Sequence, residues 1–280
     1  MKPRPSFPAR LDTTLAKNRP NTHGVQLPPV AAAVQQQLSP ASAATAKKSA
    51  TPSTAAPQGH GMESSAVRAR MVQKLAAGGI TDAHVLAAMQ AVERHRFVDS
   101  ALINQAYEDT SLPIGLGQTI SKPGVVSRML ELLRNGNSGK LGRVLEIGTG
   151  CGYQAAVLSC IATEVYSIER LRGLHDRARE NLRHLRLANL HLLFGDGMVG
   201  YAKGAPYAAI IAAAGGEAVP QAWVDQLAVG GRLVAPVVTV GKPGSAGSTQ
   251  ALLVLDKTAQ GVRQSILEAV HFVPLKSGVA

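Results

Sequence analysis

The strongest constraint on the fold is an alternation of short apolar runs and helical patterns that begins at residue 143. The apolar runs have the length and the β-branched content of buried strands. Parallel strands cannot be joined by a tight turn, so each pair needs a crossover between them. The alternation therefore predicts a doubly wound α/β sheet. The predicted strands are 143–147, 164–168, 190–194, 207–214 and 232–238, and the predicted helices between them are 153–161, 171–185 and 220–227.

The last part of the chain predicts a different kind of pairing. The runs 251–256 and 266–275 follow one another with no helical pattern between them. Two such strands are most simply joined as antiparallel neighbours. We therefore expect a mostly parallel, seven-stranded sheet with an antiparallel finish at one edge.

Three helical patterns precede the sheet. Residues 64–79 and 82–92 each place apolar side chains on one face, and Thr81 is a suitable cap for the second helix. We expect residues 64–95 to form an N-terminal helical cap on the sheet. The uncharged stretch 111–121 is expected to be a loop, and it leads into a predicted helix at 124–133.

Residues 1–62 differ in composition from the rest of the chain. They are a mixture of Pro, Ala, Ser, Gln and Thr with few large apolar side chains. Such a segment buries too little apolar surface to offset its ordering entropy. The sequence therefore predicts a disordered, low-complexity tail at 1–62 and one folded domain at 63–280.

The formal net charge of +11 raises the possibility of a nucleic-acid partner. Residues 1–62 carry seven basic side chains and a single acid, so more than half of the excess lies on the predicted tail. Within the folded part, the arginines gather on the predicted helix 171–185, where a solvated helix face explains them. We therefore do not expect nucleic acid as a partner.

Cysteine content and hydropathy restrict the setting of the protein. Cys151 and Cys160 lie nine residues apart around one predicted turn and helix, so we do not expect them to form a disulfide. No Cys/His cluster has metal-ligand spacing, and no apolar run has the roughly 18 residues of a membrane span. We expect a cytoplasmic monomer with neither a metal nor a membrane attachment.

A glycine-rich turn follows the first predicted strand. Gly148, Gly150 and Gly152 allow a sharp turn and a close approach of a ligand to the backbone at the carboxyl ends of the strands. A dinucleotide fingerprint requires a third small residue where this sequence has Tyr153. A nicotinamide cofactor is therefore disfavoured.

Acidic residues near successive strand ends indicate which ligand the turn holds. Glu146 suits a cationic amino-acid end, and Glu169 lies where an acid accepts hydrogen bonds from ribose hydroxyls. Asp196 can accept from an exocyclic amine, and the neighbouring Gly197 leaves room for a flat ring. An amino-acid end, a ribose and an adenine together make S-adenosylmethionine. We therefore expect a Rossmann-like domain of the S-adenosylmethionine-dependent methyltransferase type.

Several segments carry motifs that are more particular than the glycine turn. The most specific are "LPIGLGQTIS" at 112–121 and the closing "VHFVPL" at 270–275, alongside "VLEIGTGCGYQ", "GDG" and "PQAWVDQLAVGGRLVAPV". These segments resemble protein-L-isoaspartate O-methyltransferases over about residues 64–277. The resemblance implies methyl transfer from S-adenosylmethionine to the α-carboxylate of L-isoaspartyl, and more weakly D-aspartyl, residues of aged proteins. The ester then collapses to a succinimide, and hydrolysis returns some normal aspartate.

The resemblance also implies roles for individual residues. Ser121 aligns with the active-site serine of the family, and Thr119 and Ile120 accompany it in lining the cofactor and substrate cleft. Two positions differ from the family pattern: Ala208 replaces an aspartate, and Gly124 replaces an aromatic residue or a histidine. The resemblance therefore predicts a changed cofactor affinity with alanine at residue 208, through the ordering of the cofactor pocket, and changed substrate contacts at residue 124.

The residues alone leave other functions open. A methyltransferase acting on RNA or on a small molecule would keep the cofactor, although "AAAGGEAVP" after the fourth predicted strand lacks the polar-aromatic run of a stacked-base site. A catalytically silent domain with an RNA-binding tail is a further alternative. Salt-sensitive RNA binding that depends on residues 1–62 would distinguish it.

Overall fold

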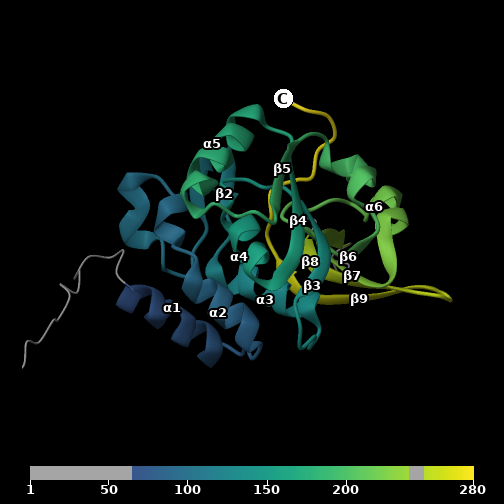
Figure 1. Cartoon of the computed structure of the whole chain (residues 1–280), viewed down its shortest axis with the longest axis horizontal. Helices are drawn as coiled ribbons and strands as arrows, with labels where there is room; N and C mark the ends of the chain where they lie inside the picture. Colours follow the sequence, from purple (N-terminus) through teal and green to yellow (C-terminus); the bar gives the residue numbers. More distant parts are fainter. Residues whose placement is uncertain (1–64, 240–248) are drawn as a thin grey trace, which may run out of the picture. The chain divides into compact units, whose positions relative to one another are not determined.

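The computed structural model describes residues 65–239 and 249–280 (Figure 1). The tail predicted at 1–62 lies outside the described residues. Within the described ranges, no helix is both long enough and apolar enough to cross a membrane.

The core element is a seven-stranded sheet with the strand order β5-β4-β3-β6-β7-β8-β9. The first five of these strands run parallel, and β8 and β9 add two antiparallel pairs at one edge. The predicted fold class and the antiparallel finish are both confirmed. The strands are β3 (Leu141–Ile147), β4 (Ala162–Glu169), β5 (Leu190–Phe194), β6 (Tyr207–Ala212), β7 (Leu227–Thr239), β8 (Thr249–Thr258) and β9 (Gly261–Val270).

Alternation along the strands divides the hydrophobic core between the two faces of the sheet. Val144 packs on one face and Leu145 on the other, and neighbouring strands repeat this alternation. One face is covered by α3 (Pro123–Arg134), α4 (Tyr153–Ile161) and α5 (Arg172–Leu182), and the other by α6 (Gln221–Gln226) with its buried Trp223. Both faces are apolar because a doubly wound sheet is covered on both sides.

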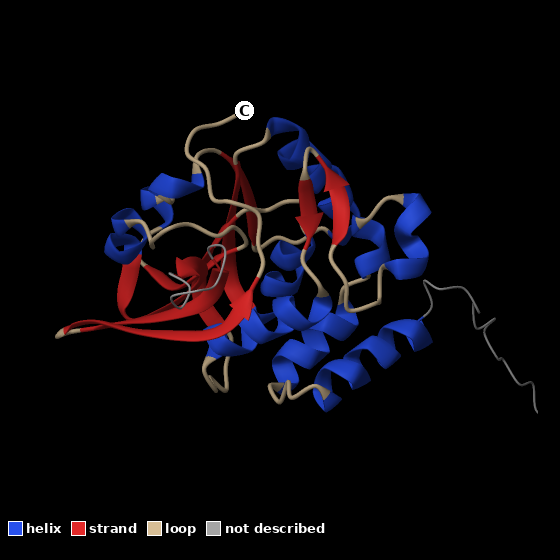
Figure 2. Ribbon diagram, turned by 180° about the vertical axis from the view of Figure 1, so that it is seen from behind, coloured by secondary structure: helices blue, strands red, loops and turns tan. Residues whose placement is uncertain are grey.

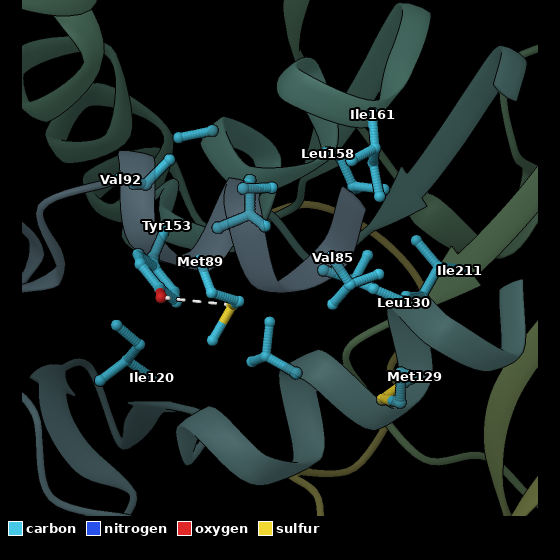
Figure 3. Close-up of a cluster of buried hydrophobic side chains, with 14 of the residues drawn as sticks. Val85, Met89, Val92, Ile120, Met129, Leu130, Tyr153, Leu158, Ile161 and Ile211 are labelled. Carbon is cyan, nitrogen blue, oxygen red and sulfur yellow. Dashed lines mark hydrogen bonds between the residues drawn. The ribbon is translucent and has the colours of Figure 1, made fainter. Parts of the chain in front are cut away.

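The N-terminal helices α1 (Ser65–Ala77) and α2 (Ala83–Ala91) pack on the α3–α4 side, as predicted. Figure 3 shows Val85 and Met89 of α2 among buried side chains of α3, α4 and the sheet. The Tyr153 hydroxyl donates to the Met89 sulfur at 3.6 Å. The predicted cap of α2 is wrong: Asp82, not Thr81, accepts from the first amides of the helix.

The expectation of a plain loop at 111–121 is also wrong. The segment forms a hairpin of β1 (Leu112–Gly115) and β2 (Gln118–Ile120), and Figure 2 shows it as two short strands apart from the large sheet. The turn places Leu116 in the left-handed region at φ 51°. Arg177 of α5 donates to the Ile114 carbonyl at 2.8 Å and so fixes the hairpin against that helix.

A buried ion pair joins the start of α2 to the end of α3. Arg134 Nε lies 2.7 Å from Asp82 Oδ2, and the Arg134 side chain is only 1% exposed. Burial by itself would raise the pKa of the Asp82 carboxyl. The hydrogen bonds from Arg134 and from two backbone amides outweigh burial and hold that pKa below its usual value.

We expect Asp82→Ala to lower the free energy of unfolding by about 3–5 kcal/mol at pH 7, because the variant leaves the Arg134 charge buried and unpaired. The loss should shrink as the pH falls below the ordinary aspartate pKa of 3.8, because protonation then removes the charge of Asp82 in the wild type as well. Urea unfolding at several pH values measures both effects. Asp176→Ala, an exposed aspartate of α5, is the control and should change stability by less than about 0.5 kcal/mol. A similar loss in both variants would contradict the assignment.

Candidate active site

A cavity of about 260 Å³ lies at the carboxyl ends of β3 and β4. Four separate parts of the chain surround it: the β1–β2 hairpin, the glycine turn, the start of α5 and the segment 273–276. The position is the one where open α/β sheets bind ligands. The polar groups that face it are backbone amides, hydroxyls and a few charged side chains.

Most of the residues predicted from the sequence border this cavity. Seven of them do so, namely Thr119, Ile120, Ser121, Gly148, Gly150, Glu169 and Gly197. Glu146, Gly152 and Asp196 lie beside the cavity without lining it, and each has a different role in the structure.

Glu169 connects the glycine turn to the helix that follows β4. One carboxylate oxygen accepts from the Gly150 amide at 2.9 Å, and the other accepts from the Leu171 amide at 2.9 Å. Each oxygen keeps a second acceptor site for a ligand. Glu169 is therefore held rigidly at the cavity wall and can still accept hydroxyl protons.

Glu146 lies on β3 beneath the glycine turn and is fully buried. Ser167 donates to its Oε2 and is itself 2.6 Å from the Thr149 hydroxyl. Its other oxygen has no hydrogen-bond partner among the described residues. Burial raises the pKa of Glu146 to about 8, although the Ser167 hydrogen bond lowers it. The side chain is thus mostly neutral at pH 7 until a cation pairs with it.

Gly152 serves packing rather than contact with the cavity. It begins α4 at φ 93°, a left-handed conformation that favours glycine. A Cβ at this position would lie 2.7 Å from Leu182 Cδ1 of α5. The third glycine of the turn therefore allows α4 and α5 to approach one another.

Asp196 follows β5 and holds two backbone amides. Its Oδ1 accepts from Met198 at 2.8 Å, and its Oδ2 accepts from Gly278 at 2.6 Å. Arg170 Nε in turn donates to the Gly278 carbonyl at 2.8 Å. Asp196 therefore fixes the segment 276–280 beside the cavity, in addition to any contact with a ligand.

A second hollow meets the cavity at Ser121. Its lining also includes Ser111, Lys122 and residues 269–272, and it contains no carboxylate side chain. The Ser121 hydroxyl forms no hydrogen bond to any described residue, and Lys122, not Ser121, is the N-cap residue of α3. Helix capping therefore does not account for Ser121, which stands between the two spaces with its hydroxyl available.

Comparisons with known proteins identify the family. A family model described as Protein-L-isoaspartate(D-aspartate) O-methyltransferase matches residues 66–280. The chain belongs to this family. A protein-L-isoaspartate O-methyltransferase of Methylibium petroleiphilum is 54% identical over 279 residues, which cover 99% of this chain and 97% of that protein.

Further relatives agree with this assignment. A protein-L-isoaspartate O-methyltransferase of Leptothrix cholodnii is 61% identical over 224 residues, covering 79% of this chain and 77% of that one. A solved structure of a protein-L-isoaspartate O-methyltransferase superposes with a TM-score of 0.66 at 27% identity, covering 76% of this chain and 67% of that one. The fold and the family predicted from the sequence are therefore confirmed together.

Ala208 is one of the two departures from the family pattern. It lies within the sheet, away from the cavity. It is the second residue of β6, whereas the cavity lies where the parallel strands end. A Cβ on Gly142, at the start of β3, would lie 3.1 Å from the Ala208 Cβ. Residue 208 therefore does not line the cavity, and a changed cofactor affinity through the ordering of the pocket stays a prediction.

Gly124, the other departure, lies at the start of α3. Its amide donates to Asp109 Oδ1 at 2.6 Å, and a Cβ would lie 2.9 Å from that oxygen. Asp109 therefore caps the helix from outside, and it approaches this closely because residue 124 has no side chain.

Sequence reasoning missed two parts of the wall. Residues 273–276 and the hairpin residues Ile114 and Leu116 line the cavity, as does Arg170. The only sequence signal for residues 273–276 was the closing motif "VHFVPL". This motif indicated the family but did not indicate a place in the site. The segment that forms the hairpin was expected near the site, but its apolar side chains were not expected to line the cavity.

We expect Glu146→Gln to lose less of its free energy of unfolding than the wild type loses when the pH rises from 4.5 to 8. Unfolded glutamate ionises above its ordinary pKa of 4.5, whereas folded Glu146 retains its proton up to about pH 8. The wild type therefore loses stability as the pH rises through this window, and glutamine cannot ionise. Urea unfolding at pH 5, 6.5 and 8 measures the free energy of unfolding. Across this window the wild type should lose at least about 1 kcal/mol more of it than Glu146→Gln does, so its slope against pH should be steeper. Glu180→Gln, at an exposed position of α5, should keep the wild-type slope, and equal slopes in all three proteins would contradict the burial argument.

Proposed function

We propose that the protein transfers a methyl group from S-adenosylmethionine to the α-carboxylate of L-isoaspartyl residues, and more weakly of D-aspartyl residues, in aged proteins. Membership of the family supports this reaction. The observation that carries it is the position of Ser121, whose available hydroxyl borders both the cavity and the second hollow. Donor and acceptor can meet there from opposite sides.

The residues around the cavity fit this cofactor. The unpartnered oxygen of Glu146 is a buried acceptor for a cationic amino-acid end, and Glu169 retains acceptor capacity for ribose hydroxyls. Asp196 would accept from the adenine amine. A Cβ on Gly197 would lie 2.5 Å from Ile147 Cγ2, so the wall there has no room for a side chain. Thr119, Ile120, Gly148 and Gly150 complete the proposed cofactor wall.

The bound cofactor would supply a methyl group already activated by the sulfonium. A carboxylate oxygen attacks the methyl carbon, the carbon–sulfur bond breaks, and a methyl ester and S-adenosylhomocysteine result. The acceptor is ionised at neutral pH, so no strong base is required. The protein's task is therefore alignment of the two reactants. We propose that Ser121 donates a hydrogen bond to the carboxylate and orients it without adding a negative charge.

The charge of the second hollow suits an anionic acceptor. Lys122 is 47% exposed beside Ser121, and its ammonium lies 3.9 Å from the Asp109 carboxylate. Asp109 is occupied by the Gly124 amide and does not line the hollow. We propose that isoaspartyl peptides lie in this hollow, with the reacting carboxylate at Ser121.

We further propose that the methyltransferase domain spans 63–280 and acts as a monomer in the cytoplasm, without nucleic acid. The tail 1–62 takes no part in the reaction in this proposal.

The first test compares methyl transfer to two peptides that differ only in isoaspartate against aspartate. We expect transfer to the isoaspartyl peptide alone, with kcat/KM reduced about 10- to 100-fold in Ser121→Ala because the acceptor is less well oriented. Ser138→Ala, an exposed serine after α3, is the control and should match the wild type. Cofactor binding without transfer to either peptide would reject the proposed acceptor.

A second test concerns Lys122. We expect Lys122→Gln to raise KM for an isoaspartyl peptide about three- to five-fold and to leave kcat nearly unchanged, because an exposed charge contributes modestly and acts on binding alone. Raising the salt concentration should reduce the difference between the two proteins. A fall in kcat at unchanged KM would show that Lys122 acts on the reaction step.

A further inference from the structure

A groove lies between the end of α5 and the outer strand β5, and it shares no residue with the cavity or the second hollow. Figure 1 shows α5 and β5 as neighbours at this edge of the sheet. Its floor is apolar, with Leu190 and Leu192 of β5 and Leu187 before them. Its rim carries three arginines, Arg179, Arg183 and Arg186.

These three arginines are exposed, and none forms an ion pair or a hydrogen bond with another described residue. Other arginines of the same helix are engaged differently. Arg177 bonds the hairpin, and the Arg172 guanidinium lies 3.6 Å from the centre of the Phe194 ring. The unpaired arginines of α5 and of the turn that follows it are therefore gathered at the groove, whereas the exposed Asp176 and Glu180 of the same helix do not line it.

Arg186 occupies a backbone position that is unfavourable for its type. Its φ of 47° lies in the left-handed region, where glycine or asparagine is favoured. The residue ends the helical turn 183–185, and its side chain has no intramolecular partner within the described ranges. Its guanidinium is therefore free to contact another molecule.

The open edge of β5 provides backbone groups in the same groove. The Asn189 carbonyl and the Gly195 amide form hydrogen bonds with β4. The direction of the backbone hydrogen-bonding groups alternates along a strand, so those of Leu192 and Phe194 point away from β4. The strand Leu-His-Leu-Leu-Phe contains no proline, lysine or acid that would block pairing with another strand. An extended polypeptide could therefore hydrogen-bond to this edge.

We propose that this groove binds an extended acidic polypeptide segment of another protein. The segment would add to the edge of β5 with both apolar side chains and carboxylates on the face that it turns toward α5, so that the apolar side chains contact Leu190 and Leu192 and the carboxylates meet the three arginines. The combination of a strand edge, an apolar floor and unpaired cations on one side fits that chemistry. An apolar floor without exposed aromatic rings lacks the stacking platform that single-stranded nucleic acid uses.

Charge also excludes two other occupants. Residues 1–64 contain seven basic side chains and two acids, and residues 240–248 contain no acid, so neither segment of this chain complements the arginines. A second copy docked through the same strand would bring the same three positive charges together. The occupant is therefore expected to come from a different protein.

The test uses the full-length protein and a fluorescent 12-residue peptide in which every second residue is glutamate or valine in turn and threonine stands between them, so that one face of the strand carries both carboxylates and apolar side chains. We expect saturable binding at low salt that weakens as salt rises, and at least ten-fold weaker binding in the triple variant Arg179→Glu, Arg183→Glu, Arg186→Glu. The control triple variant Arg70→Glu, Lys74→Glu, Lys203→Glu has the same net charge and should bind as the wild type does. Methylating the backbone nitrogens of alternate peptide residues should also abolish binding, because edge pairing needs the peptide amides.

Each remaining outcome would overturn the proposal. These outcomes are absence of peptide binding at low salt, equal losses in the two triple variants, no effect of backbone methylation, or tighter binding of a single-stranded oligonucleotide at the same groove. Methyl transfer to a short isoaspartyl peptide with no other charged side chain should be the same in the wild type and both triple variants. Failure of the groove is therefore distinguishable from failure of the proposed reaction.

Discussion

Parallel pairing of β3 with β4 on one side and β6 on the other is the constraint on which the site depends. It brings the ends of these strands to one edge of the sheet, so that Gly148 follows one strand and Glu169 ends the next. Backbone bonds from Gly148 and Thr149 to the Ile168 carbonyl continue the pairing into the glycine turn. The turn is therefore held by the sheet itself and borders the cavity in a fixed arrangement.

The electrostatics of the site follow from this geometry. Glu146 lies inside the sheet, where burial keeps it neutral, and Glu169 lies at the rim, where two backbone amides bind its oxygens. In the second hollow, the exposed Lys122 follows Ser121 and no carboxylate borders the space. A cationic donor and an anionic acceptor would thus meet environments of opposite charge. This separation favours alignment over acid–base chemistry as the source of rate.

The wall of the cavity depends on segments that are distant in sequence. Arg177 fixes the hairpin to α5, and Asp196 with Arg170 fixes residues 276–280 at the other side. Arg179 of α5 lines the groove beside β5, together with Arg183 and Arg186 of the turn after the helix. Helix α5 therefore supports the candidate cavity through Arg177 and, with the turn that follows it, offers a separate surface.

The sequence alone determined the α/β class, the strands of the large sheet along the chain, and the glycine turn with its acidic neighbours. These depend on local periodicity and on spacing within one strand–turn–helix unit. The motifs around Ser121 also indicated the family. Only the tertiary structure decided that Asp82 caps α2, that Gly152 makes room for Leu182, and that Ala208 lies away from the site. It alone placed the closing segment against Asp196 and left Ser121 between two spaces. Each of these depends on contacts between residues far apart in the chain, which local patterns do not encode.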